Sequence, residues 1–74
     1  SGNDRVRLGS SVILSCGGAK EKYVIVGPDE ADIFAGKVSH KSPLGEAVLG
    51  KKPGDKVVLK TPGGKIEYEI EEIT

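Results

Sequence analysis

Residues 39–55 read SHKSPLGEAVLGKKPGD, and this stretch contains the only plausible helix of the 74-residue chain. Ser42 can cap the free amide groups at the start of a helix, and Pro43 has the φ angle that suits a first helical position. Gly50 can adopt the left-handed conformation that ends a helix, and Pro53 forbids its continuation. The spacing therefore predicts a helix of about two turns between Ser42 and Gly50.

One face of this predicted helix is apolar. Leu44, Ala47 and Val48 follow the i, i+3, i+4 spacing, Leu49 widens the stripe, and Glu46 points away from it. A helix of this length is not stable in isolation. We therefore expect its apolar face to pack on a sheet.

The remaining residues carry strand and turn signals. Short strands are predicted at residues 4–8, 12–14, 23–26, 37–39, 56–60 and 65–71. A flexible turn at residues 17–21 is expected to join the second and third of these into a hairpin. One helix packed on a twisted antiparallel sheet is an α+β design, and the length allows a single domain.

The last strand has a clear inward face formed by Ile66, Tyr68 and Ile70. Ile73 is out of step with Ile70, which predicts a β-bulge near residues 71–72. Such a bulge would let both isoleucines face the core.

Three other apolar residues are predicted to be covered. Ile33 and Phe34 follow an acidic loop at residues 29–32 and are expected to return towards the core. Val58 interrupts the alternation of its strand, which suggests burial on both faces or a covered sheet edge.

The composition limits the classes of function. With 11 basic and 11 acidic residues the formal net charge is zero, so no long-range field attracts the chain to nucleic acid or an anionic membrane. Cys16 is the only cysteine, which excludes an internal disulfide and favours a small, half-buried strand residue. No apolar run approaches ~18 residues, and we expect a soluble, cytoplasmic protein. Residues 1–4 read as a tag remnant or linker end, and residues 5–74 as the domain.

No pattern predicts catalysis or a metal site. His40 is the only histidine and reads as a solvated loop residue, and no serine has a His-Asp partner. Asp29, Glu30 and Asp32 lack the regular ligand spacing of a calcium loop. A turn cap, an ion-paired loop and a contact for a basic patch on a partner remain open for these carboxylates. We expect no enzymatic activity, no cofactor and no bound metal.

An ordered set of short motifs covers nearly the whole chain, from about Arg5 to Ile73. The motifs are YVIVG at 23–27, DEAD at 29–32, VS at 38–39, SPLG at 42–45, AVLGK at 47–51, GD at 54–55 and TPGG at 61–64. In this order they closely resemble the carboxy-terminal domain of the bacterial transcript-cleavage factors GreA and GreB. The resemblance implies a fold like that of FKBP-type prolyl isomerases, in which a curved antiparallel sheet packs on one short helix.

The resemblance also implies a partner. In that family this domain docks on bacterial RNA polymerase, at the coiled coil beside the secondary channel. A separate amino-terminal helical hairpin enters the channel and helps to hold a catalytic magnesium ion for cleavage of backtracked RNA. This chain does not contain that hairpin. The implied docking surface comprises Ser39, Lys41, Ser42 and Pro43, with Asp29, Glu30 and Asp32 near it. Lys41 stands where relatives often carry a small, polar or acidic residue, which leaves the polarity of the contact open.

Three classes of function remain: a polymerase-binding module, a prolyl isomerase and a nucleic-acid binder. An isomerase needs an aromatic-lined pocket, and the chain offers only Tyr23, Phe34 and Tyr68. Acidic residues offset the lysines around the helix, so contact with nucleic acid is expected to be weak or indirect. The favoured hypothesis is a polymerase docking domain with no membrane partner and no small-molecule substrate. Its parent is either a cleavage factor or a Gre-like regulator without cleavage activity.

Overall fold

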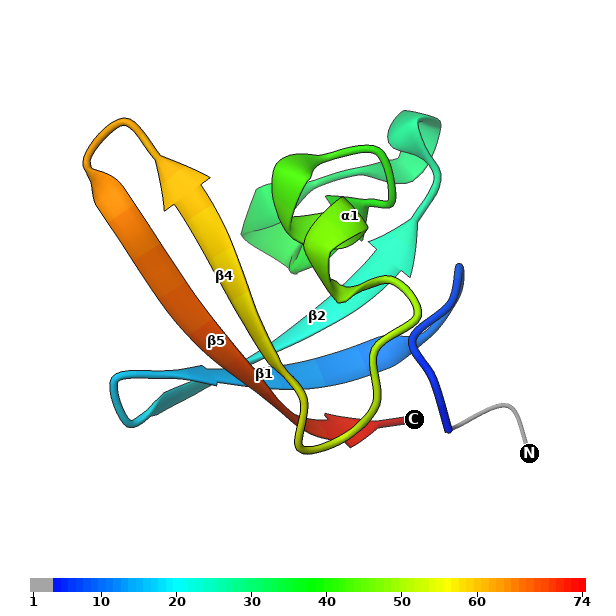
Figure 1. The fold of residues 1–74 in the computed structure, drawn as a ribbon. Helices are drawn as coiled ribbons and strands as arrows, with labels where there is room; N and C mark the ends of the chain where they lie inside the picture. Colours follow the sequence, from blue (N-terminus) through cyan, green and yellow to red (C-terminus); the bar gives the residue numbers. More distant parts are fainter. Residues whose placement is uncertain (1–3) are drawn as a thin grey trace.

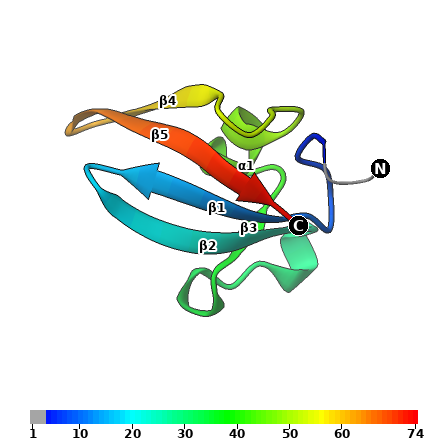
Figure 2. The ribbon, with the colours of Figure 1, turned by 90° about the horizontal axis from the view of Figure 1, so that it is seen from below.

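The computed structural model describes residues 4–74. These residues contain a five-stranded sheet and one α-helix, joined by loops and two 3-10 turns (Figure 1). The elements are β1 (Ser11–Cys16), β2 (Ala19–Val26), the 3-10 turns η1 (Pro28–Glu30) and η2 (Ile33–Ala35), β3 (Lys37–Ser39), α1 (Pro43–Val48), β4 (Lys56–Thr61) and β5 (Gly64–Ile73). The sheet order is β3-β2-β1-β5-β4, and the sheet curls around α1 (Figures 1 and 2). The predicted α+β class, a curved sheet packed on one short helix, is confirmed.

The β1–β2 hairpin has a shorter turn than predicted. Gly17 and Gly18 have φ angles of 59° and 89°, and pairing begins immediately beside them at Cys16 and Ala19. Two residues with positive φ match the twist of the flanking strands. Residues 19–21, which were predicted to lie in the turn, therefore belong to β2.

The predicted bulge in the last strand is confirmed. The β1–β5 register shifts between Ile13, which faces Glu72, and Leu14, which faces Ile70. Glu71 is therefore the extra residue of β5. Because of this shift, Ile70 and Ile73 are both buried in the core.

One strand pairing differs from the predicted antiparallel sheet, because β3 pairs with β2 in parallel. The chain returns between these strands through η1 and η2, and Asp32 then forms an antiparallel bridge with Lys37. Residues 28–35 thus cover the outer edge of β3. The parallel direction places the carboxyl ends of β2 and β3 at one edge, where the His40 amide donates to the Val26 carbonyl at 2.9 Å.

The core lies between the concave face of the sheet and α1. Val48 of α1 is fully buried, while Leu44 and Ala47 pack against the core from its rim. Leu49 is 41% exposed, because α1 ends at Val48 and Leu49 is already extended. The prediction that Leu49 widens the apolar stripe is wrong. The buried core residues are Val6, Val12, Leu14, Ile25, Val38, Val48, Val57, Ile70 and Ile73.

Two further predictions about apolar residues are wrong. Residues 4–8 form no regular strand: Val6 is buried and exchanges backbone hydrogen bonds with Gly50 and Lys51, but Leu8 is 59% exposed. Val58 is 51% exposed, because β4 is the uncovered edge of the sheet and Val58 lies opposite the exposed Glu67.

The start of α1 is held as predicted. The Ser42 hydroxyl accepts a hydrogen bond from the Gly45 amide at 3.1 Å and donates one to the Ser39 carbonyl at 2.7 Å. Pro43 occupies the first helical position, and Gly50 has a φ of 80° just beyond the helix.

Gly45 has a role that the sequence patterns did not reveal. It is buried, and a Cβ atom at this position would overlap with the Ser39 carbonyl oxygen and lie 2.9 Å from the Ser39 carbonyl carbon. The absence of a side chain at Gly45 therefore allows α1 to rest directly on the end of β3.

We expect Gly45→Ala to lower the free energy of unfolding by about 2 kcal/mol, because the added methyl group overlaps with the Ser39 backbone. At an ordinary helical position the same substitution would stabilise the domain by about 1 kcal/mol. Urea unfolding of both forms measures the sign. Gly27→Ala is the matched control, because its Cβ would meet no atom within 4 Å. A stabilised Gly45→Ala variant would contradict this account of the contact.

We expect Ser42→Ala to cost about 1 kcal/mol of stability, because the Gly45 amide loses its side-chain cap. Thermal and urea unfolding measure the loss. Ser11→Ala serves as the comparison, since Ser11 is half-buried on a strand and does not cap a helix. Equal stabilities for the two variants would show that the cap is unimportant.

Candidate functional site

A mostly apolar cleft of about 370 Å³ opens between η2, β3, the start of α1 and β4. Its walls are formed by Ala31, Ile33, Lys37, Val38, Ser39, Ser42, Pro43, Leu44 and Leu59. Lys37 is the only charged residue among them. Such a surface suits an apolar group more than a polar substrate.

The connection between β3 and α1 positions one wall of the cleft. Only residues 40–42 separate the two elements, and the Ser42 hydroxyl binds back to the Ser39 carbonyl. This tight connection directs Pro43 and Leu44 along the cleft. Leu59 of β4 also lines the cleft. The curl of the sheet brings β4 close to α1 (Figure 1).

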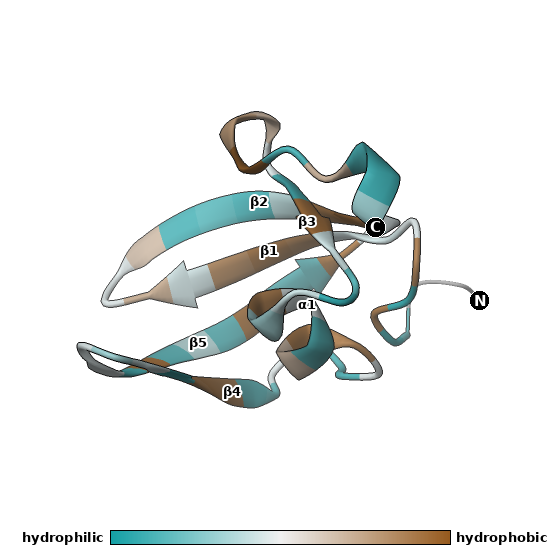
Figure 3. Cartoon of the chain, turned by 90° about the horizontal axis from the view of Figure 1, so that it is seen from above, coloured by the Kyte–Doolittle hydropathy of each residue, from teal (hydrophilic) through white to brown (hydrophobic). Residues whose placement is uncertain are grey.

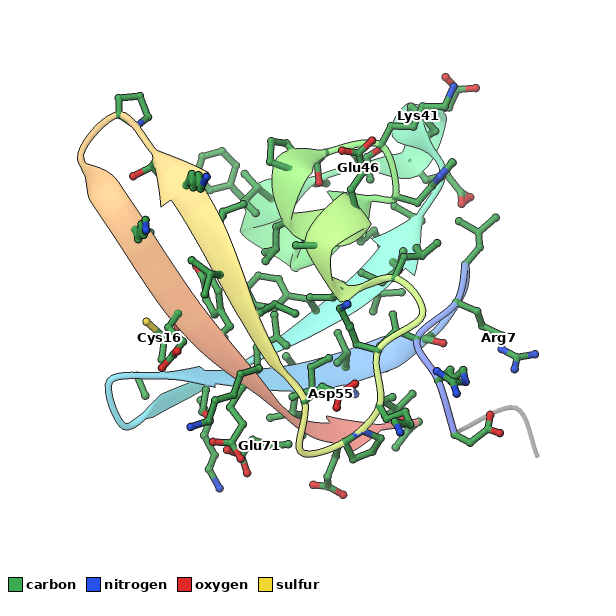
Figure 4. The ribbon with its side chains drawn as sticks, viewed as in Figure 1. Arg7, Cys16, Lys41, Glu46, Asp55 and Glu71 are labelled. Atoms are coloured by element: carbon green, nitrogen blue, oxygen red, sulfur yellow. The ribbon has the colours of Figure 1, made fainter. Side chains whose placement is uncertain are left out.

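Three of the predicted docking residues, Ser39, Ser42 and Pro43, lie together in this cleft. Both hydroxyls have local partners, because Ser39 Oγ accepts from the Lys41 amide at 3.0 Å and Ser42 Oγ caps α1. They therefore shape the loop, and the ring of the exposed Pro43 is the group that a partner can reach. Lys41 is exposed outside the cleft, at the same end of the molecule as Glu46 (Figure 4).

The predicted acidic trio is divided between the two ends of β3. Asp29 and Glu30 are exposed on η1, which leaves the end of β2 beside the end of β3. Asp32 lies at the start of β3, and its Oδ1 accepts from the Phe34 amide at 3.1 Å. The structure thus gives Asp32 the turn-cap role. Within residues 4–74 no group of three His, Cys, Asp or Glu side chains has the arrangement of a metal site.

The clearest feature that sequence reasoning missed is η2. Ile33 is 63% exposed and Phe34 is 100% exposed, so the prediction that they return to the core is wrong. Figures 2 and 3 show this turn projecting from the sheet beside β3, and Figure 3 shows its hydrophobic tip. A signal was present: the Asp32 cap and Gly36, whose φ is 76°, frame a tight turn at 33–35 that carries its side chains away from the core.

The remaining candidate groups lie away from the cleft. Cys16 is half-buried in β1, near the β1–β2 turn, and Ser15 donates to a Glu71 carboxylate oxygen at 2.6 Å (Figure 4). Tyr23 and Tyr68 pack against the core, and burial, helped by Tyr68, raises the pKa of Tyr23. Among the described residues no aromatic ring lines the cleft, so it does not match the pocket of a prolyl isomerase.

No helix in residues 4–74 has the length and apolar character that crossing a bilayer requires. The predicted tag or linker at residues 1–4 lies mostly outside the described residues. Of it, Asp4 is described and forms an exposed ion pair with Arg7 at 3.7 Å.

Comparison with known proteins gives a consistent result. A family model for the transcription elongation factor GreA/GreB C-terminal region matches residues 1–74. The chain is 46% identical over 70 residues to GreA of Streptococcus thermophilus, covering 92% of this chain and 44% of that protein. It is 46% identical over 71 residues to GreA of Pseudomonas putida, covering 93% of this chain and 44% of that protein.

Solved structures share the fold. The crystal structure of GreA factor homolog 1 of Thermus thermophilus superposes with a TM-score of 0.84 at 36% identity, covering 97% of this chain and 49% of that one. A GreA/GreB elongation factor from Nitrosomonas europaea gives a TM-score of 0.81 at 28% identity, covering 96% and 61% of the two chains. The chain thus spans less than half the length of the curated relatives cited here. Since both its sequence and its curled sheet with one short helix match, this chain belongs to the GreA/GreB family of bacterial transcription elongation factors, as their C-terminal domain.

Proposed function

We propose that this domain docks its parent factor on bacterial RNA polymerase, at the coiled coil beside the secondary channel. The observation that carries the proposal is the position of Ser39, Ser42 and Pro43. These residues, which the family resemblance implicates in docking, line one apolar cleft. Membership of a transcription elongation factor family supports polymerase as the partner.

The cleft suits docking because its free surface is apolar while its rim is charged. Pro43, Leu44 and Leu59 offer apolar contact area in the cleft. Lys41 and the carboxylates of Asp29 and Glu30 are exposed around the loop and can orient a charged partner. In this proposal Ser39 and Ser42 hold the loop in shape, and Asp32 holds the neighbouring η2 turn.

The domain's own contribution is binding rather than chemistry. Docking would place a separate amino-terminal coiled coil at the channel, where it promotes cleavage of backtracked RNA. A Gre-like regulator without cleavage activity would use the same domain in the same way, so the docking proposal applies to either parent. Neither role requires a metal ion or a cofactor within this domain.

We expect Pro43→Ala to weaken binding of this domain to purified bacterial RNA polymerase by about tenfold, which corresponds to ~1.4 kcal/mol. Alanine is tolerated at a first helical position, and Pro43 is exposed, so stability should change by less than about 0.5 kcal/mol. Interferometry at low and high salt measures the affinity, and a thermal melt checks the fold.

Two controls make this experiment decisive. Pro62→Ala changes an exposed proline in the β4–β5 turn, outside the cleft, and should leave affinity unchanged. A polymerase without the tip of its channel-side coiled coil should fail to bind the wild-type domain. Equal binding to the intact and truncated polymerases, or unchanged affinity of a folded Pro43→Ala variant, would overturn the proposed dock.

A further inference from the structure

Residues 5–7, which we call the N-terminal arm, lie beside the chain that leaves α1 (Figure 1). The Val6 amide donates to the Lys51 carbonyl at 2.9 Å, and the Gly50 amide donates to the Val6 carbonyl at 2.8 Å. The Arg5 guanidinium adds a hydrogen bond to the Gly50 carbonyl at 3.0 Å. These bonds join the arm to the residues that directly follow the C-terminal end of α1.

The arm also contributes to the core. Val6 is 2% exposed and belongs to the same buried cluster as Val48, the fully buried residue of α1. Arg5 and Arg7, on either side of Val6, are exposed. Val6 is therefore the residue that anchors the arm, and it does so in the part of the core that α1 covers.

These contacts matter to α1 because it is short. A helix of 6 residues has little stability of its own and depends on what holds its ends. At its start, Ser42 and Gly45 hold α1 on β3. At its end, the arm holds Gly50. The arm therefore supports α1 from the opposite end to Pro43 and Leu44, which line the cleft.

The arm is held by fewer contacts than the central strands of the sheet. β1 and β5 each pair with a neighbouring strand along both edges. The arm forms no regular strand, and Val6 is the only one of its residues that is buried. Segments with few buried contacts open locally, without unfolding of the whole domain. We therefore expect the arm to separate from Gly50 and Lys51 more readily than the sheet opens.

We propose that the N-terminal arm is a strap across the C-terminal end of α1 that keeps the cleft in its binding shape. When the arm is in place, α1 is held at both ends, and Pro43 and Leu44 have fixed positions in the cleft wall. When the arm separates, the C-terminal end of α1 loses its support and the wall loosens with it. Only the strapped form presents the formed cleft, so the apparent affinity of the cleft falls with the fraction of strapped domains.

This inference concerns regulation of the cleft, and it rests on the proposed function wherever polymerase affinity is the readout. The coupling between the arm and α1 is a property of the domain itself and is tested without a partner. A C-terminal domain is joined to the rest of its factor through the residues that precede it, and in this chain the arm precedes β1. The position of that upstream region therefore acts on the strap, and through α1 on the cleft.

The first test is Arg5→Ala, with Arg7→Ala as the matched control. Both variants lose one exposed arginine, but the Arg5 guanidinium bonds to Gly50, whereas that of Arg7 pairs with Asp4 at 3.7 Å. Native-state hydrogen exchange, measured by NMR, follows the Glu46 amide in the first turn of α1. We expect Arg5→Ala to raise its exchange rate about fivefold, because the strapped form loses one hydrogen bond, and Arg7→Ala to leave the rate unchanged.

The wild-type domain supplies the reference for this test. Its Glu46 amide should exchange together with the Val6 and Gly50 amides, and at least about tenfold faster than the amides of β1 and β5. Faster exchange of Gly50 alone in Arg5→Ala, with Glu46 unchanged, would show that the arm frays without α1 and would overturn the strap. Exchange of Glu46 at the rate of the sheet amides would also overturn it, because α1 would then open only with the whole domain.

The second test is Val6→Asp, which places a charge at the buried anchor of the arm. Leu8→Asp is the matched control, because it adds the same charge two residues further on, at a position that is 59% exposed. We expect the sheet of Val6→Asp to remain folded by NMR while its α1 amides lose protection. Its affinity for RNA polymerase, measured by interferometry, should fall at least about tenfold, and Leu8→Asp should bind as wild type does.

The outcomes separate this inference from the docking proposal. Loss of the sheet signals in Val6→Asp would show that the arm does not open on its own and would overturn the strap. Unchanged affinity of a Val6→Asp domain whose α1 is unprotected would overturn the link between the strap and the cleft. If the wild-type domain does not bind polymerase, the docking proposal fails, while hydrogen exchange still decides whether the arm and α1 open together.

Discussion

The approach of Gly45 to the Ser39 carbonyl is the contact on which the rest of the structure depends. A helix as short as α1 has little stability of its own and must gain it from packing. The missing side chain at Gly45 lets α1 rest on the end of β3, and the Ser42 hydroxyl links the same two elements. This position of α1 buries Val48 against the concave face of the sheet. The same contacts that cap α1 therefore also close the core.

The parallel pairing of β2 and β3 determines which residues lie on the surface beside β3. It requires the chain to return along the outer edge of β3, and this return path contains η1 and η2. The edge is protected from pairing with other chains, whereas the β4 edge carries Lys56 and Lys60, which discourage such pairing. The same path brings Ile33 and Phe34 beside the cleft, so edge protection and the candidate binding surface come from one segment.

The candidate site offers shape and apolar area more than reactive groups. The hydroxyl groups of Ser39 and Ser42, which the resemblance placed on the docking surface, are engaged in the loop and the helix cap. Of the three carboxylates, Asp29 and Glu30 are exposed on η1, whereas Asp32 caps the η2 turn. What remains for a partner is a proline ring, an aliphatic cleft, an exposed phenylalanine and a few charges at the rim. These features are the ones on which the proposed docking role rests.

The sequence by itself determined the features that depend on neighbouring residues: the Ser42 cap with Pro43, the stop near Gly50, the strand periods and the bulge that brings Ile73 into step with Ile70. It also carried the family resemblance, because ordered motifs do not require a model of contacts. Only the tertiary structure decided the exposure of Phe34 and Val58, the parallel direction of β3 and the contact that requires Gly45. The physical reason is that burial and strand direction depend on which distant segment covers a residue, and hydrophobicity along the chain carries no such information.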